Sequence, residues 1–346
     1  MKYRNSNIEA LRVIAMLGVI ALHYVNGSMG GINCKTEFPD FVWIFVTLVR
    51  GFAIPLVNVF VIITGYFLIQ SRKFSMRKPI ELLVIVAWYG MLFYIGGCVF
   101  GLHSFSVKEL IKNIAPYFFG QKWFIKTYII LYLLFPFLNV LLNNLKLKDY
   151  QALLVIQVSI FSLWYSLGYS SPINDDGYGI INFITLYFIG GYIRRFSSQC
   201  RVLTRINFGK GFVGYVFASF CTAALSIAIW PFGYAYITNV LAATLLFVAF
   251  VKLPVRENKI VNRLAVHCFD VFFVHIQIIP YLGIMAAVES NWLVIHFITS
   301  LVVCYLLGSI SGFFRALIFK HTVNKILGSI QWINQTHNII LDCSNN

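Results

Sequence analysis

Three residues whose side chains could take part in catalysis or ligand binding lie in the first long apolar segment of the chain. Glu9, Arg12 and His23 interrupt an otherwise almost wholly apolar run from Ile8 to Val25. A charge within a membrane helix costs at least a few kcal/mol, so it usually persists for a function. At ~100° and ~1.5 Å per residue, Arg12 and His23 share one helix face and lie roughly 16 Å apart along it. One face therefore carries an acid, a permanent cation and a titratable imidazole.

These residue types suggest a binding role and a proton-transfer role. An arginine is suited to bidentate binding of phosphate or carboxylate, and a histidine is the usual general base for removing a proton from a hydroxyl. Glu9 lies three residues before Arg12, close enough to pair with it. In the structural alternative, Arg12 extends to the membrane interface and His23 makes a hydrogen bond between helices. The cost of placing these groups in a membrane favours the functional interpretation.

The composition indicates an integral membrane protein. The 346 residues are 59% hydrophobic and only 11% charged, with a mean hydropathy of +0.79, whereas globular domains carry about 25% charged residues. The net charge of +15 comes from Lys and Arg in short loops, which set membrane topology, so we expect a lipid bilayer and no nucleic acid as partner. The seven cysteines lack zinc spacing. We expect no metal and no bound cofactor.

The elements that position the chemical residues are predicted to be transmembrane helices. The fold class is therefore all-α, a polytopic helical bundle of about ten spans that forms one domain over residues 1–346. Each predicted span is near the ~20 residues needed to cross the hydrocarbon core. The predicted spans are roughly 8–29, 41–70, 79–101, 123–143, 150–169, 179–194, 211–230, 233–251, 265–287 and 292–315.

The basic residues predict the orientation of these spans. With the N-terminus inside, 20 of the 27 Lys and Arg residues lie in inner loops and 5 in outer loops. Cytoplasmic loops carry an excess of Lys and Arg. We therefore expect a multi-pass protein of the inner (plasma) membrane with both termini in the cytoplasm.

Two further charged residues fall inside predicted spans. Arg50 has no acidic residue three or four positions away, so it needs a partner from another helix or a watery cavity. Asp270 follows His267 by three residues, and pairing between them is the simple structural explanation. A catalytic role for Asp270 is the less favoured alternative.

Several segments, taken in order, resemble the acyltransferase 3 family. These bacterial membrane proteins of about ten helices move acyl groups, often acetyl, onto hydroxyls of envelope glycans. The similar segments are Glu9-x-x-Arg12 with His23; Val57 to Phe67, ending in Thr64-Gly65-Tyr66-Phe67; the basic cluster Arg72 to Lys78; Trp123-Phe124 with Pro136-Phe137-Leu138-Asn139; and Phe272-Phe273-Val274-His275.

The resemblance implies an O-acyltransferase that takes an acyl group, with acetyl as the expected group, from acyl-CoA as co-substrate. It places His23 and Glu9 in the catalytic set, with His23 as general base. It assigns Arg12, Arg72 and Arg77 to acyl-donor binding. For Arg72 and Arg77 the alternative is topological, because an inner loop requires basic residues in any case.

The acceptor implied by the resemblance is a cell-envelope or exported polysaccharide. The candidate acceptor-binding residues are Asn58, Trp123, Phe124 and His275. An aromatic belt at the membrane interface explains Trp123 and Phe124 equally well, and an interhelical hydrogen bond explains Asn58. Two other functional classes stay open: a transporter or flippase for a glycan or small anion, and a structural or sensory membrane protein.

Overall fold

The computed structural model describes residues 5–32, 40–115, 123–168, 176–254, 257–330, 332, 335 and 337–338. The chain divides into two compact units, each built from two stretches of sequence. Unit 1 comprises Met1–Ile69 and Asn144–Gly312, and unit 2 comprises Gln70–Asn143 and Phe313–Asn346. The prediction of a single domain over residues 1–346 stays a prediction.

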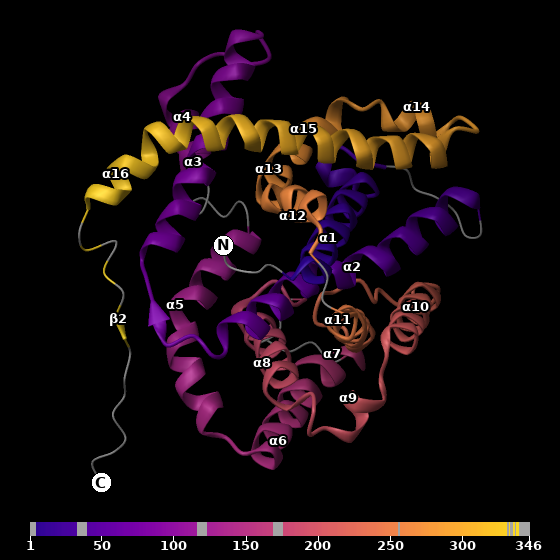
Figure 1. Ribbon diagram of the computed structural model, residues 1–346. Helices are drawn as coiled ribbons and strands as arrows, with labels where there is room; N and C mark the ends of the chain where they lie inside the picture. The colour runs from indigo at the N-terminus through magenta and orange to yellow at the C-terminus, as the bar shows by residue number, and fades with distance from the viewer. Residues whose placement is uncertain are drawn as a thin grey trace. The chain divides into compact units, whose positions relative to one another are not determined.

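Unit 1 is a bundle of helices (Figure 1). Two short 3₁₀ helices and one π-helical turn join the α-helices, at Gly27–Met29, Ile279–Tyr281 and Ser159–Leu163. The α-helices are α1 (Ser6–Tyr24), α2 (Phe41–Leu68), α6 (Leu147–Val158), α7 (Trp164–Ser166), α8 (Ile180–Phe196), α9 (Arg201–Arg205), α10 (Phe208–Leu225), α11 (Ile237–Val251), α12 (Lys259–Val266), α13 (Cys268–Ile278), α14 (Ile284–Val288) and α15 (Leu293–His321), the last of which belongs to unit 1 up to Gly312.

Unit 2 contains long helices and one small sheet. Strand β1 (Lys73–Phe74) pairs antiparallel with β2 (His337–Asn338), with Lys73 opposite Asn338. No strand was expected from the sequence, because the pairing joins two-residue segments far apart in the chain. The helices are α3 (Arg77–Val99), α4 (Val107–Ile114), α5 (Trp123–Asn144, in unit 2 up to Asn143), the end of α15 and α16 (Val323–Ser329).

The all-α prediction is confirmed, but the count of ten spans is not supported. In the described residues, six helices are long and apolar enough to cross a membrane: α1, α2, α3, α5, α10 and α15. A seventh candidate joins α12 to α13 and the turn after it, bent by 56°. The other predicted spans fall on α6 with α7, on α8 and on α11. The π-helical turn interrupts the first of these, α8 has 17 residues with Arg194 and Arg195 in its last turn, and α11 has 15 residues.

Small residues let the helices of unit 1 approach closely around α2. A Cβ atom on Gly65 of α2 would lie 2.2 Å from the Tyr187 carbonyl oxygen of α8, and one on Gly190 of α8 would lie 2.2 Å from the Ile62 carbonyl oxygen. Small residues at a helix interface allow such backbone contact within a membrane. Because α1 also packs along α2, this packing fixes the helix that carries the chemical residues.

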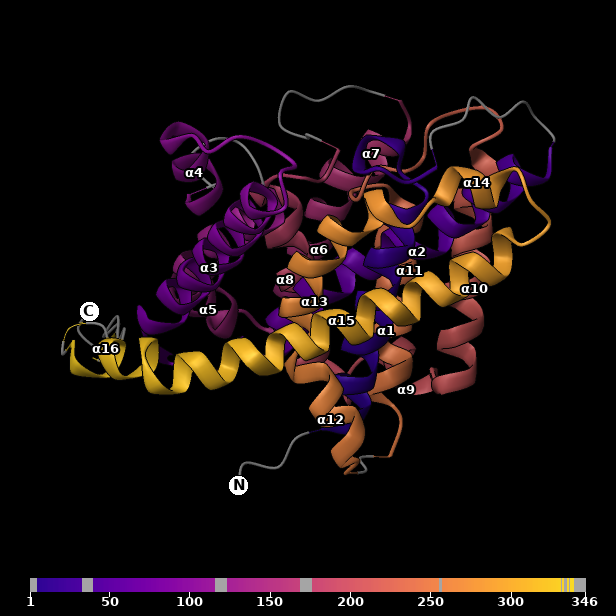
Figure 2. The same cartoon turned by 90° about the horizontal axis from the view of Figure 1, so that it is seen from above.

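Hydrogen bonds hold both ends of α1. At its start, the Ser6 hydroxyl donates to the Asn262 side chain over 2.8 Å, and the Asn7 amide donates to the Pro254 carbonyl oxygen over 3.0 Å. At its end, the buried Tyr24 hydroxyl lies 2.7 Å from His296 of α15. Figure 2 shows α9 and α12 at one end of unit 1, and α7 and α14 at the other. Thus α1 runs between these two ends.

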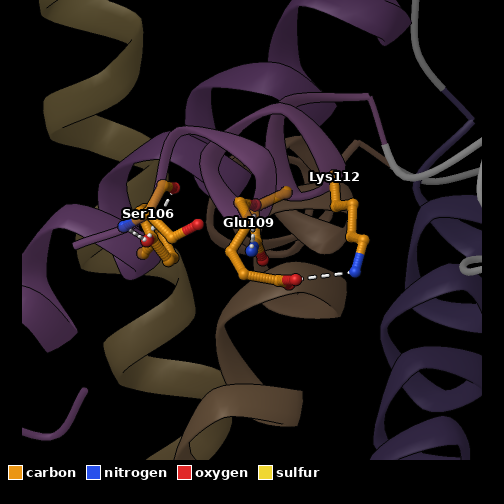
Figure 3. Close-up of polar contacts among 5 residues, drawn as sticks. Ser106, Glu109 and Lys112 are labelled. Carbon is orange, nitrogen blue, oxygen red and sulfur yellow. Dashed lines mark hydrogen bonds and ion pairs between the residues drawn. The ribbon is translucent and has the colours of Figure 1, made fainter. Parts of the chain in front are cut away.

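In unit 2, polar contacts attach the short helix α4 to α3. The Tyr94 hydroxyl of α3 accepts a hydrogen bond from the Ser106 amide at 2.6 Å and donates to the Ser106 carbonyl oxygen at 2.9 Å. Along α4, Lys112 donates to Glu109 over 2.6 Å, as Figure 3 shows. Together these contacts fix the start of α4 and stabilise its exposed face.

Candidate functional site

The centre of the candidate site is a pair of histidines from two helices. Nδ1 of His23, in the last turn of α1, lies 2.7 Å from Nε2 of His275 in α13. The ring planes are within 15° of parallel and the centroids are 4.9 Å apart. That separation is about the N–N distance plus a ring radius at each end, so the rings meet edge to edge, as a hydrogen bond requires. The His23 ring is partly exposed, whereas His275 is fully buried.

The second nitrogen of His275 contacts the backbone of its own helix. His275 Nδ1 lies 2.8 Å from the Val271 carbonyl oxygen. A carbonyl oxygen can only accept a hydrogen bond, so Nδ1 carries a proton and donates it. A continuous hydrogen-bonded line therefore runs from Val271 through His275 to His23.

The charged pair of α1 lies towards the other end of the helix. Arg12 Nη1 donates to Glu9 Oε1 over 2.6 Å. The guanidinium also lies over the Phe67 ring of α2, 5.7 Å from its centroid. The Arg12 side chain is 31% exposed and the Glu9 side chain 9%. Within the described residues Glu9 takes one of the five N–H donors of Arg12, which leaves donors for an anionic ligand.

The separations along α1 divide these residues into two groups. At ~1.5 Å rise per residue, Arg12 and His23 are about 16 Å apart and Glu9 and His23 about 21 Å apart along the axis. Glu9 and His23 therefore cannot act on the same proton. The contact with Arg12 gives Glu9 a pairing role, and its place in the catalytic set stays a prediction.

The predicted pairing of His267 with Asp270 is confirmed. His267 Nδ1 lies 3.4 Å from Asp270 Oδ2, and Asp270 is only 1% exposed. A Cβ atom on Gly312 of α15 would lie 2.5 Å from that same carboxylate oxygen, so the glycine lets α15 pass close to the pair. The pair thus belongs to the packing between α13 and α15.

Arg50 has its partner on another element, as the sequence analysis required. Its Nη2 donates to the Val25 carbonyl oxygen over 3.0 Å, directly after α1. The guanidinium also lies 5.4 Å from the ring centroid of Trp230 and 5.8 Å from that of Phe232. A cation is favourable at the C-terminal end of a helix because the exposed carbonyl groups carry partial negative charge. Arg50 therefore stabilises the end of α1 that carries His23.

Two predicted acceptor-binding residues lie in unit 1. The buried Asn58 of α2 donates to the Tyr234 carbonyl oxygen over 2.8 Å, so it holds the chain before α11. His275 contacts His23 as described above. The structure thus gives both residues protein partners, and their contact with an acceptor stays a prediction.

The remaining predicted residues lie in unit 2. Arg72 is exposed, and Arg77 Nε donates to Glu81 Oε1 over 2.6 Å. The Trp123 and Phe124 rings meet edge to face with centroids 5.6 Å apart, and both are partly exposed. Their assigned roles in donor and acceptor binding stay predictions.

Two contacts of the site were not predicted from the sequence. His275 was expected to bind the acceptor, and Tyr24 and His296 were not among the candidate residues. The pairing of His23 with His275 joins residues 252 positions apart, and that of Tyr24 with His296 joins residues 272 apart. The available signal was that both late histidines fall inside apolar segments, where a polar side chain needs a partner.

Comparison with protein families gives one match. A family model described as an acyltransferase domain matches residues 5–312, a range that includes α1 to α14, the site residues and most of α15. Comparisons with curated proteins and with solved structures found no match.

Proposed function

We propose a specific transfer reaction for this chain, which belongs to the acyltransferase 3 family and is a multi-pass membrane acyltransferase. In this reaction an acyl group, most simply acetyl, moves from acyl-CoA to a hydroxyl of a cell-envelope or exported polysaccharide. The proposal rests on the family and on one observation about the site. That observation is the partly exposed His23 ring, held at the end of α1 by a hydrogen bond to a second imidazole.

In the proposed reaction His23 is the general base. It removes the proton from the acceptor hydroxyl while that oxygen attacks the thioester carbonyl carbon. The new C–O bond forms, the C–S bond of the tetrahedral intermediate breaks, and the thiolate of coenzyme A takes the proton back from His23. A positioned general base typically contributes ~10²–10⁴-fold to such a rate.

Arg12 is the proposed anchor for the acyl donor. Its guanidinium is partly exposed and keeps N–H donors beyond the one that Glu9 accepts. Forked donors suit phosphate oxygens. The separation of about 16 Å between Arg12 and His23 along α1 suits a long donor whose phosphates bind near Arg12 while its thioester reaches His23.

The topology proposed for this reaction places the donor on the cytoplasmic side. Both termini are cytoplasmic and the protein crosses the plasma membrane ten times, provided that the bent pair α12 and α13, α6 with α7, α8 and α11 cross in addition to the six long helices. The bias of 20 inner to 5 outer basic residues supports this orientation. The acceptor then reaches His23 from the outer side.

A transfer assay tests the proposal. Purified protein in nanodiscs is supplied with acetyl-CoA and, as acceptor, an envelope-glycan fraction from cells that lack the gene, and release of the coenzyme A thiol is followed in parent and His23→Ala. In parallel, mass spectrometry compares the envelope glycans of cells with and without the gene, reading acetyl-sized mass shifts. Thiol release that depends on His23, with glycan acetylation that depends on the gene, supports the function; the absence of both refutes it.

A further inference from the structure

The nitrogen of His23 that acts as base follows from the hydrogen-bonded line behind it. A base must be unprotonated, so the reactive state of the pair carries one proton on each ring. The proton of His275 is on Nδ1, because that atom lies 2.8 Å from the Val271 carbonyl oxygen, which only accepts. His275 Nε2 then carries the lone pair.

The same reasoning extends across the contact between the rings. His275 Nε2 lies 2.7 Å from His23 Nδ1, and one of two hydrogen-bonded nitrogens must hold the proton. Because His275 Nε2 is the acceptor, the proton is on His23 Nδ1. The lone pair of His23 is therefore on Nε2, the nitrogen that faces away from His275.

We propose that His275 is a positioning residue that holds His23 in the Nδ1–H tautomer and so makes Nε2 the base. The inference rests on the proposed function of His23 as general base. Which nitrogen of a histidine is protonated is set by the hydrogen bond that the other makes. Here the Val271 carbonyl oxygen sets the tautomer of His275, and His275 sets that of His23.

The arrangement also suits the charge that forms during the reaction. When His23 Nε2 takes the proton of the acceptor hydroxyl, the ring becomes an imidazolium and Nδ1–H stays bonded to the neutral His275. Hydrogen bonds from an ionised donor are roughly twice as strong as neutral ones. His275 therefore stabilises the protonated state more than the resting state, which is the condition for lowering the barrier. The proton then passes from Nε2 to the leaving thiolate, and the pair returns to its starting state.

Two substitutions of His275 separate this role from simple packing. In His275→Gln the side-chain carbonyl oxygen can take the place of Nε2 and accept from His23. In His275→Leu a side chain of comparable size offers no acceptor. Phe272→Leu is the packing control, because the Phe272 ring lies edge-on to His275 with centroids 6.0 Å apart but takes no part in the hydrogen-bonded line.

The first measurement is the tautomer of His23, read from ¹⁵N side-chain chemical shifts of the full-length protein in lipid, with His23→Ala for assignment. We expect the parent, His275→Gln and Phe272→Leu to show a protonated Nδ1, and His275→Leu to shift the proton to Nε2. A parent with the proton on Nε2, or an unchanged tautomer in His275→Leu, overturns the proposal.

The second measurement is thiol release from acetyl-CoA by the same proteins in the presence of the same glycan acceptor. We expect His275→Leu to lower kcat by roughly 10²-fold, at the lower end of the ~10²–10⁴-fold that a positioned general base contributes, with KM for acetyl-CoA within about twofold. His275→Gln should recover at least tenfold of that loss. Parental kcat in His275→Leu refutes the positioning role, whereas parental activity in His23→Ala refutes the proposed function itself.

Discussion

Replacing Arg12 tests the donor site, and its effect can be estimated from the contacts of the guanidinium. Glu9 accepts a hydrogen bond from one of the five N–H groups of Arg12, so two parallel N–H groups of the guanidinium are available for a phosphate. A hydrogen bond to a charged group contributes ~1.5–3 kcal/mol, and an ammonium cannot reproduce the fork. We expect Arg12→Lys to lose one such bond, about 2 kcal/mol, which weakens donor binding roughly 30-fold.

The neighbouring carboxylate complicates the simplest substitution. Glu9 has a side-chain exposure of 9%, so Arg12→Gln alone leaves a buried carboxylate without its cation, which destabilises the protein. The double variant Glu9→Gln/Arg12→Gln removes both charges and avoids this effect. It should unfold at a temperature close to that of the parent and still lose at least 30-fold in donor affinity.

The assay is calorimetric titration with a non-hydrolysable thioether analogue of acetyl-CoA. Arg201→Gln, which removes an exposed cation of α9, controls for the loss of one positive charge. Its affinity should stay within about twofold of the parent. If the folded double variant binds the analogue as tightly as the parent does, Arg12 is a packing residue and the donor-site assignment is wrong.

Three further outcomes are expected. His23→Ala should lower acyl transfer by roughly 10²–10⁴-fold without loss of membrane insertion; near-parental glycan acetylation would remove His23 from the mechanism. Gly65→Ala should lower the unfolding temperature, by overpacking of about 1–3 kcal/mol, whereas Gly96→Ala, with open space around its Cβ position, should not; equal effects would contradict the packing account. Reporter fusions at Ser290 and Lys325 should report outside and inside respectively, and the same side for both would contradict the topology.

The sequence was informative about the helix that carries the chemistry. The apolar run around Glu9, Arg12 and His23 predicted α1, and the three-residue spacing predicted the contact of Glu9 with Arg12, because local geometry alone decides both. The contact of His23 with His275 depends on how α1 packs against α13. No spacing within one helix contains that information, so only the folded chain revealed it.

Two of the predicted spans contain backbone irregularities that hydropathy does not show. Hydropathy marked 265–287 as one span, but the helix bends by 56° between Val266 and Cys268, where His267 pairs with the buried Asp270. Similarly, the apolar residues of 150–169 continue through a π-helical turn at Ser159–Leu163. A window of mean hydropathy responds to composition and not to backbone hydrogen bonding, so it detects neither the bend nor the π-helical turn.

The two contacts that hold the end of α1 place different constraints on sequence change. Arg50 donates to the main-chain carbonyl of Val25, a group that every residue type offers, so this contact requires no particular side chain at position 25, where burial of Val25 is the constraint. The contact of Tyr24 with His296 joins two side chains, so a change in one removes a hydrogen-bond partner of the other. Among diverging sequences, we therefore expect an arginine at position 50 to persist whatever residue occupies position 25. Positions 24 and 296, by contrast, should change together as a covarying pair.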